Sequence, residues 1–294
     1  MVAQARKVTG IPAAQAVLRR PRVERVVALF VRSTVVEESA RFVAHELLPG
    51  RRRAVYRLRG SASRVVIRHG TADVVTLDEV FHVRDYELPG PVARELESLD
   101  APRVLDLGAN IGLFGLFVLD RYPRARITSI EADPDNAAVL RECIAINRAG
   151  ERWEVVEAVA SAHEGTASFV AGEYSLSHVA APGEAGIPVR AVDVFGYLAE
   201  TDLAKIDIEG GEWGILGDPR LANAPVRAIV VEYHAFACPA PHPREAAAAA
   251  LRTAGFDVEA DGADDYGIAW ARRPESRQAR TASSSSSGTS PTTG

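Results

Sequence analysis

Several residues whose types can bind a ligand lie in one short segment, residues 106–112, which reads Asp-Leu-Gly-Ala-Asn-Ile-Gly. This glycine loop follows a strand-like run at residues 103–107 and leads into a helical run at residues 111–121, the setting of nucleotide-type binding loops. Glycine allows the backbone to turn tightly and to approach a ligand closely, so Gly108 and Gly112 are candidate cofactor-binding residues. Open α/β sheets bind ligands at this place, the carboxyl end of a strand.

Two classes of cofactor compete for the glycine loop. A dinucleotide site has the pattern G-x-G-x-x-G, with the pyrophosphate at a helix N-terminus. Here Asn110 replaces the middle glycine, and the carboxylate of Asp106 would repel a phosphate. S-adenosylmethionine carries an ammonium and a sulfonium and has no phosphate, so the charge of Asp106 favours it. An NAD-dependent oxidoreductase or epimerase is the alternative, although Lys7 and Lys205, the two lysines of the chain, supply no Tyr-x-x-x-Lys pair.

Glu131 ends the second predicted strand, about 25 residues after Asp106. An acid at this place is suited to accept hydrogen bonds from the two ribose hydroxyls of a cofactor. Both NAD and S-adenosylmethionine contain a ribose, so Glu131 is a predicted cofactor-binding residue that does not discriminate between them.

A second acidic segment, residues 205–212, reads Lys-Ile-Asp-Ile-Glu-Gly-Gly-Glu and is predicted to run from a strand through a turn into a helix. Lys205 and Asp207 share one face of the strand. A charge on a mostly buried strand needs a partner, and Lys205 is the candidate partner of Asp207. Glu209 and Glu212 are three residues apart, so they can share one face if the helix begins there. Acidic residues at the start of a helix are also favourable because they interact with the positive end of the helix dipole.

If the cofactor is S-adenosylmethionine and the methyl acceptor is an oxygen, the protein must align the acceptor and remove its proton. The candidate catalytic residues are Asp207, Glu209, Glu232 and His234, because Glu232 ends the fifth predicted strand and His234 lies two residues further on. A histidine titrates near neutral pH and suits a general base. As an alternative, Asp207, Glu232 and His234 can hold a divalent metal, although our primary assignment includes no metal.

The elements that must position these residues alternate between strand and helix from about residue 100 onward, which predicts a doubly wound, mostly parallel α/β sheet. The expected strands cover residues 103–107, 125–131, 153–159, 204–208 and 227–232, with a strand pair at 166–170 and 187–191. We expect three parts: helices and a β-hairpin over residues 1–90, a cofactor-binding domain over 91–273, and a disordered Ser- and Thr-rich tail over 274–294.

Composition narrows the function further. The net charge of -5 argues against a nucleic-acid partner. Two cysteines without a CxxC pair fit a reducing cytoplasm, and no apolar run is long enough to predict a membrane span. Residues 1–90 are expected to form a lid or a homodimer contact.

The motifs in their order resemble those of the FkbM-type methyltransferases. They are the glycine loop, Glu-Ala-Asp-Pro at residues 131–134, the acidic segment, and Val-Glu at residues 231–232. The resemblance runs from about residue 65 to residue 235. It implies a class I methyltransferase-like (Rossmann-like) fold, S-adenosyl-L-methionine as cofactor, and methylation of hydroxyl oxygens on polyketide natural products or sugars.

The resemblance also implies roles for single residues. Gly108, Asn110 and Gly112 would contact the methionine part of the cofactor, Asp106 would anchor that end, and Glu131 would hold the ribose. Ala158 and Val159, at the end of the third predicted strand, would lie near the adenine. The chain departs from the family at residues 191–193, where Ala-Val-Asp replaces the commoner Thr-Leu-Asp.

A third hypothesis is a non-catalytic module that keeps the cofactor fold. The presence of Asp106, Glu131 and Asp207 argues against such a loss of activity.

Overall fold

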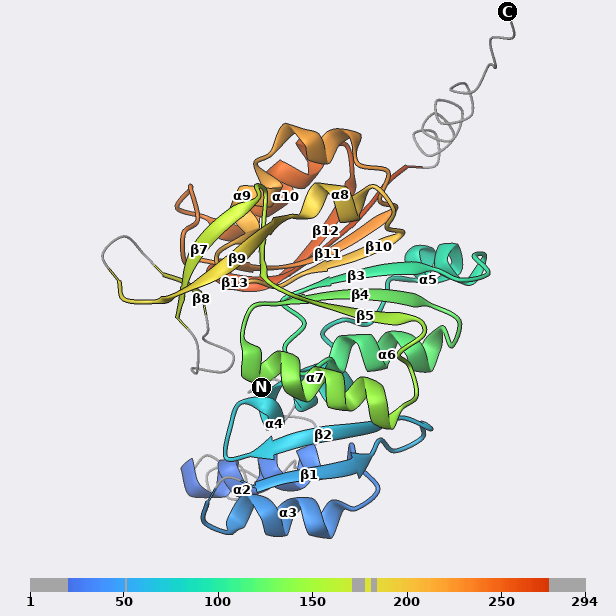
Figure 1. Ribbon diagram of the computed structural model, residues 1–294, viewed down its shortest axis with the longest axis vertical. Coiled ribbons are helices and arrows are strands. Elements are labelled where there is room, and N and C mark those ends of the chain that lie inside the picture. The colour runs from blue at the N-terminus through green and yellow to red at the C-terminus, as the bar shows by residue number, and fades with distance from the viewer. Residues whose placement is uncertain (1–20, 51, 171–177, 181–183, 275–294) are drawn as a thin grey trace, which may run out of the picture. The chain divides into compact units, whose positions relative to one another are not determined.

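A computed structural model describes residues 21–50, 52–170, 178–180 and 184–274 of the chain (Figure 1). The chain divides into two compact units, one ending at Val83 and one beginning at Arg84. The sequence predicts this boundary near residue 90. The expected tail lies, apart from its first residue, outside the described residues, as does the loop at residues 171–177.

The first unit contains the predicted hairpin. Its strands β1 (Arg52–Arg57) and β2 (Arg64–His69) pair in antiparallel register, with Arg57 opposite Arg64. From residue 21 onward, the helical elements of this unit are α2 (Pro21–Ser33), α3 (Ser39–Leu47), α4 (Asp73–Asp78) and the π-helix η2 (Glu79–Val83). The hairpin is therefore confirmed, and the described part of the segment before it, residues 21–50, contains two short helices.

Seven strands of the second unit form its central sheet, in the order β12-β13-β11-β10-β3-β4-β5. The strands β11, β10, β3, β4 and β5 pair in parallel, and β13 is antiparallel to both of its neighbours. The bounds are β3 (Arg103–Leu107), β4 (Arg126–Glu131), β5 (Trp153–Glu157), β10 (Leu203–Ile206), β11 (Ala228–His234), β12 (Asp257–Gly262) and β13 (Tyr266–Arg272). The predicted doubly wound, mostly parallel α/β sheet is confirmed.

Helices cover both faces of this sheet (Figure 1). Two of them, α6 and α7, lie below β3, β4 and β5 in the figure, and α8, α9 and α10 lie above the sheet. The bounds are α5 (Gly90–Glu97), α6 (Leu113–Arg121), α7 (Pro134–Ile146), α8 (Val194–Leu198), α9 (Glu212–Leu216), the 3-10 helix η4 (Pro219–Asn223) and α10 (Pro243–Thr253).

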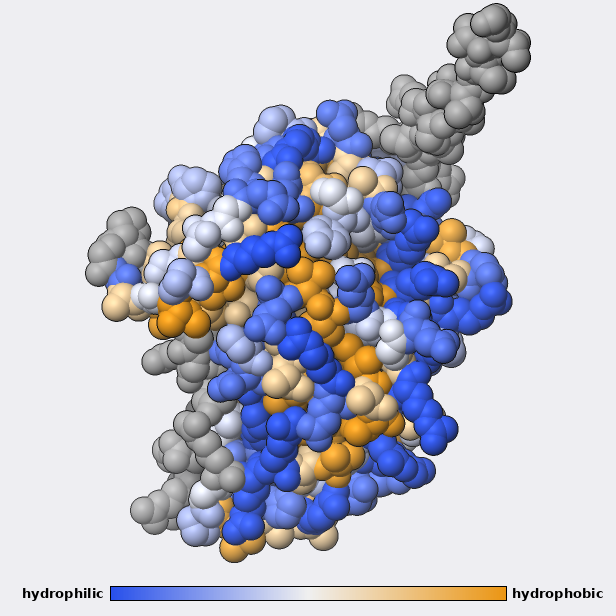
Figure 2. All heavy atoms as spheres, in the orientation of Figure 1, coloured by the Kyte–Doolittle hydropathy of each residue, from blue (hydrophilic) through white to orange (hydrophobic). Residues whose placement is uncertain are grey.

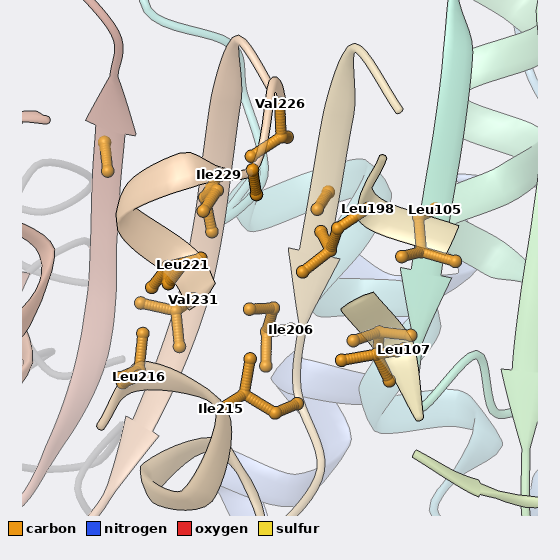
Figure 3. Close-up of a cluster of buried hydrophobic side chains, with 14 of the residues drawn as sticks. Leu105, Leu107, Leu198, Ile206, Ile215, Leu216, Leu221, Val226, Ile229 and Val231 are labelled. Carbon is orange, nitrogen blue, oxygen red and sulfur yellow. The ribbon is translucent and has the colours of Figure 1, made fainter. Parts of the chain in front are cut away.

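The core above the sheet explains why the central strands β10 and β11 are almost entirely buried, as strands covered on both faces are. Leu107, Ile206 and Val231 come from three neighbouring strands and are fully buried. They belong to one cluster with Leu198 of α8 and Ile215 of α9 (Figure 3). This packing fixes the strand ends from which the candidate site residues project.

One strand prediction is wrong. Residues 153–159 were expected as a single strand, but the chain leaves the central sheet after Glu157, and β6 (Val159–Ser161) joins a second sheet. The change occurs at Ala158, whose N–H donates to the carbonyl of Glu131 at 3.0 Å. Val159 then pairs with Ala191 of β9 instead of continuing beside β4.

The second sheet has the order β6-β9-β7-β8. It contains the predicted strand pair, since β7 (Gly165–Val170) and β9 (Ile187–Asp193) are antiparallel, and β8 is the short strand His178–Val179. At the end of β9 Asp193 caps α8 by accepting from the N–H of Phe195, and it pairs with Arg220. Asp193 thus joins the end of β9 to α8 and to η4.

No helix in the described ranges has the length and hydropathy needed to cross a membrane. Hydrophilic residues cover much of the face of the molecule in view in Figure 2, and hydrophobic residues appear between them.

Candidate active site

The glycine loop connects β3 to α6 through three residues with left-handed backbone: Gly108 at φ +73, Asn110 at φ +49 and Gly112 at φ +86. A Cβ atom at Gly108 would lie 1.7 Å from the carbonyl oxygen of Asp207, and one at Gly112 would lie 2.3 Å from Leu140 Cδ1. The protein's own packing therefore requires both glycines. The close contact at Gly108 brings the loop directly against the end of β10.

Glu131 ties the glycine loop to the start of α7. Its Oε2 accepts from the N–H of Asn110 at 2.7 Å, and its Oε1 accepts from the N–H of Asp133 at 2.9 Å. Burial raises the pKa of Glu131 to about 7, although these hydrogen bonds oppose the shift. A carboxylate offers about four acceptor positions, so further positions remain for ribose hydroxyls. Ala158 and Val159, the expected adenine neighbours, are buried where the chain leaves β5.

Asn110 presents an unusual polar atom at the loop. Its Oδ1 is buried and has no hydrogen-bond partner among the described residues. A buried acceptor without a partner is costly, so a ligand with a donor at this place would relieve the cost. Asn110, Asp106 and Glu131 all provide acceptor oxygens, which suits a cationic amino group and hydroxyls better than a pyrophosphate.

Lys205 connects the glycine loop to the acidic segment. Its Nζ lies 3.0 Å from Asp207 Oδ2 and 3.4 Å from Asp106 Oδ1, and it donates to the carbonyl of Gly108 at 3.0 Å. The expected pairing of Lys205 with Asp207 is present. Asp106 is fully buried, and burial raises its pKa while Lys205 opposes the shift. One ammonium group therefore joins both acids.

Tyr86 is a site residue that the sequence does not reveal. Its hydroxyl donates to Glu232 Oε2 at 2.6 Å and lies 3.2 Å from Asp207 Oδ2. Its ring packs edge-on against Phe114, with 5.4 Å between the centroids. Burial and the charges of Asp207 and Glu232 raise the pKa of Tyr86, so it remains a donor at neutral pH. No motif marks Tyr86, because its partners lie 121 and 146 residues away in the chain.

His234 lies among carboxylates at the end of β11. Its Nδ1 is 3.1 Å from Glu212 Oε1, and its Nε2 is 3.6 Å from Glu209 Oε2 and 3.7 Å from Glu232 Oε1. Burial alone would lower the pKa of His234, but its carboxylate partners raise it to about 11. The side chain is therefore protonated at neutral pH. This environment conflicts with the expectation that His234 is the general base, because an imidazolium has no free lone pair to accept a proton.

Glu212 and Glu209 flank the turn after β10 in different environments. Glu212 has no exposed surface, and it accepts from the N–H of Gly210 at 2.7 Å and from the N–H of His234 at 3.0 Å. Glu212 thus joins the start of α9 to β11. Glu209 has left-handed backbone at φ +47, and 32% of its side chain is exposed. Burial raises the pKa of Glu209 to about 7, with Asp207 and Glu232 adding to the shift and His234 opposing it.

The fold thus brings all four predicted catalytic residues to the carboxyl ends of β10 and β11. Asp207, Glu232 and His234 each offer one ligand atom, and these atoms lie within 4.8 Å of one another. The predicted cofactor residues Asp106, Gly108 and Asn110 lie beside this group, because Gly108 contacts Asp207. The arrangement can hold a cationic ligand next to groups that accept a proton.

Comparison with known proteins identifies one matching family model. The model described as the methyltransferase FkbM domain matches residues 106–257, which contain the glycine loop, the acidic segment and β11. No curated protein matches the chain.

Several solved structures are similar to the chain at low sequence identity. The precorrin-6y C5,15-methyltransferase of Geobacter metallireducens is 16% identical with a TM-score of 0.39, over 63% of this chain and 86% of that one. An O-methyltransferase family protein of Burkholderia thailandensis is 16% identical with a TM-score of 0.35, and the match covers 69% of this chain and 60% of that one. TYW2 of Pyrococcus horikoshii, in complex with MeSAdo, is 12% identical with a TM-score of 0.38, and the match covers 76% of this chain and 72% of that one.

Proposed function

Because the chain belongs to the FkbM methyltransferase family, we propose that it transfers the methyl group of S-adenosylmethionine to a hydroxyl oxygen of a small molecule. The acceptor class we propose is a sugar or a polyketide-type natural product. The observation that carries the hydroxyl as acceptor is the group of carboxylates at the ends of β10 and β11, beside the glycine loop. An oxygen acceptor must lose a proton, and carboxylates can accept one.

The residues at the glycine loop fit S-adenosylmethionine. The buried, unpartnered Oδ1 of Asn110 would accept from the ammonium group of the methionine part. Glu131 would accept from the ribose hydroxyls with the acceptor positions that its two backbone hydrogen bonds leave free. Asp106 adds a buried negative charge below the loop, which favours a cationic ligand over a dinucleotide.

The cofactor supplies an electrophilic methyl group on a positively charged sulfur. In the proposed reaction a lone pair of the acceptor oxygen forms the new O–C bond, the S–C bond breaks, and the sulfur keeps that electron pair as a neutral thioether. The hydroxyl proton must pass to a base on the protein. The protein's part is to align the acceptor oxygen and to accept this proton.

We assign the proton acceptor to Glu209. Asp207 is held by Lys205 and Tyr86, and Glu232 accepts from Tyr86, so both carboxylates already have close partners. His234 carries its proton at neutral pH. Glu209 has the most exposed side chain of these four candidates, and its pKa of about 7 suits proton transfer near neutral pH.

The first experiment measures thermal unfolding of the purified protein with S-adenosylhomocysteine and, separately, with NAD. A ligand present at about 100 times its dissociation constant stabilises the folded state by roughly 2.7 kcal/mol. We expect S-adenosylhomocysteine to raise the melting temperature and NAD to leave it unchanged. A shift with NAD alone would replace this proposal with an oxidoreductase or epimerase.

The second experiment identifies the acceptor class. The protein is incubated with S-adenosylmethionine labelled in its methyl group and with a panel of sugars, polyketides, amines and thiols. We expect label in hydroxylated compounds and its retention as a methyl ether under mild acid. Transfer to amines or thiols alone would contradict O-methylation and leave the family assignment intact.

A further inference from the structure

The side chains of Asp207, Glu232 and His234 are arranged like ligands that coordinate a metal ion directly. Each side chain offers one ligand atom within 4.8 Å of the others. Their side chains are 24%, 13% and 11% exposed, so the group is not a solvated acidic surface. In the part of the chain that the structure describes, no other group of three His, Cys, Asp or Glu residues meets this geometry.

Buried polar groups hold the two carboxylates in place. Asp207 Oδ2 is 3.0 Å from Lys205 Nζ and 3.2 Å from the Tyr86 hydroxyl, and Glu232 Oε2 accepts from Tyr86 at 2.6 Å. Tyr86 and Lys205 are each only 4% exposed. One oxygen of each carboxylate thus has a protein partner, while the other oxygen has no hydrogen bond among the described residues. Metal-binding carboxylates are typically fixed by outer partners in this way.

The same pattern holds for the histidine. His234 Nδ1 lies 3.1 Å from Oε1 of the fully buried Glu212, which orients the ring. Nε2 then lies 3.6 Å from Glu209 Oε2 and 3.7 Å from Glu232 Oε1, and both distances are too long for a hydrogen bond. A histidine that binds a metal through one nitrogen usually donates from the other nitrogen to a carboxylate.

Charge supports a cation at this place. Among the described residues, five carboxylates surround the strand ends and only two basic side chains face them. The carboxylates are those of Asp106, Asp207, Glu209, Glu212 and Glu232, and the basic groups are those of Lys205 and His234. S-adenosylmethionine adds a net charge of only about one positive unit, from its ammonium, sulfonium and carboxylate. A divalent cation would neutralise the remaining excess.

We infer that Asp207, Glu232 and His234 bind one divalent cation, with two oxygen ligands and one nitrogen ligand. The cation displaces the Nε2 proton of the imidazolium, which leaves to solvent, so that Nε2 has a lone pair for the metal. Carboxylates suit Mg²⁺ and Mn²⁺, and imidazole suits the later transition metals, so Mn²⁺ is the cation that best matches the mixed set. Three protein ligands leave coordination positions open. If the proposed function is correct, these positions select acceptors with two adjacent oxygen atoms, and the metal lowers the pKa of the hydroxyl that is methylated.

The test titrates Mn²⁺ into the full-length protein by calorimetry and follows bound Mn²⁺ by electron paramagnetic resonance. We expect one Mn²⁺ per chain in the wild type. Glu232→Gln, which keeps the shape of a ligand but removes its charge, should weaken binding by about 100-fold. Tyr86→Phe keeps all three ligands but removes the outer hydrogen bonds to Glu232 and Asp207, and it should weaken binding by about tenfold.

Glu209→Gln is the matched control, because it removes one negative charge from the same place but none of the three ligands. It should weaken Mn²⁺ binding by less than about fivefold, because the loss of one partly exposed charge near a site changes the affinity only modestly. Equal weakening in Glu209→Gln and Glu232→Gln would mean diffuse attraction and would overturn the inference. Failure of the wild type to bind Mn²⁺ would overturn it as well.

Stabilisation by S-adenosylhomocysteine shows that each variant is folded and tests the proposed function separately. A protein that binds S-adenosylhomocysteine but not Mn²⁺ contradicts the metal site alone. A protein that binds Mn²⁺ but not S-adenosylhomocysteine contradicts the proposed function and leaves the metal site intact.

Discussion

Glu131 gives the cofactor site a dependence on pH. Burial raises its folded-state pKa from 4.5 to about 7, so between these values the folded protein holds a proton that the unfolded chain has lost. The contribution of Glu131 to stability is therefore fully present below pH 4.5 and is lost as the pH rises through about 7. Binding of ribose hydroxyls to the carboxylate acts in the opposite direction, because it favours the ionised form.

We therefore expect the affinity for S-adenosylhomocysteine to rise between pH 6 and pH 8, by up to about tenfold per pH unit below the pKa. Calorimetric titration across this range measures the effect. Glu131→Gln should bind more weakly and lose most of the pH dependence. An unchanged pH profile in Glu131→Gln would exclude Glu131 as the titrating group.

Glu209 carries the second prediction for a single residue. If Glu209 accepts the acceptor's proton, Glu209→Gln should lower kcat by about 10²- to 10⁴-fold. The affinity for S-adenosylhomocysteine should change little, because the carboxylate lies on the acidic segment and not on the glycine loop. The measurement uses the acceptor found in the labelling panel. Retention of kcat within threefold of wild type would transfer the role to another residue.

The electrostatic environment of His234 could not be predicted from the sequence alone. A histidine near the end of a strand predicts a neutral base, yet three carboxylates from β11, α9 and the turn before α9 surround it. Their combined charge depends on folded distances and cannot be obtained from spacing in the chain. Tyr86 was missed for the same reason, since it meets its partners only after the strands have packed.

At the scale of elements, the contact between the glycine loop and β10 sets the geometry of the site. Gly108→Ala would place a Cβ atom 1.7 Å from the carbonyl oxygen of Asp207 in a backbone conformation that is unfavourable for alanine. We expect it to lower the free energy of unfolding by roughly 3 kcal/mol or more and to weaken S-adenosylhomocysteine binding. Denaturant unfolding and calorimetry measure the two effects.

Gly150→Ala is the control for this substitution, because no atom lies within 4 Å of the added Cβ and the backbone is not left-handed. It should leave stability within about 0.5 kcal/mol of wild type. Similar stability for Gly108→Ala and Gly150→Ala would contradict the close approach of the loop to β10.

The elements themselves were largely predictable. Apolar runs and strand–helix alternation predicted the five parallel strands and the hairpin, because local periodicity follows burial directly. The division of residues 153–161 between two sheets was not predictable. It depends on the hydrogen bond from Ala158 to Glu131 and on the pairing of Val159 with Ala191, both of which join distant segments.

At the scale of the whole molecule, the first unit has a polar core of its own. The hydroxyl of the fully buried Tyr56 lies 2.8 Å from His45 Nδ1 and 2.6 Å from His69 Nε2, and His69 Nδ1 lies 2.6 Å from Glu46 Oε1. Removing the central hydroxyl would leave two imidazole nitrogens without a partner. This chain of contacts stabilises the unit that ends at Val83.

Tyr56→Phe should therefore destabilise the first unit by about 1–3 kcal/mol while the second unit keeps its affinity for S-adenosylhomocysteine. Hydrogen exchange of residues 52–69 measures the local effect. Tyr122→Phe is the matched control in the second unit. The Tyr122 hydroxyl makes two longer hydrogen bonds, donating to the carbonyl of Ala93 and accepting from Arg121 Nε, each at 3.3 Å. Faster exchange of residues 52–69 in the control would contradict a local origin.

Lys205 links the binding of ligands at two neighbouring places. Its single ammonium group contacts Asp106 below the glycine loop, Asp207 at the acidic segment, and the carbonyl of Gly108 between them. A ligand that binds at Asp106 or at Asp207 weakens the ion pair between Lys205 and that carboxylate. The ion pair between Lys205 and the other carboxylate changes in response. Occupancy at the two places is therefore thermodynamically linked, and the linkage is reciprocal: Mn²⁺ must change the affinity for S-adenosylhomocysteine by the same factor as S-adenosylhomocysteine changes the affinity for Mn²⁺.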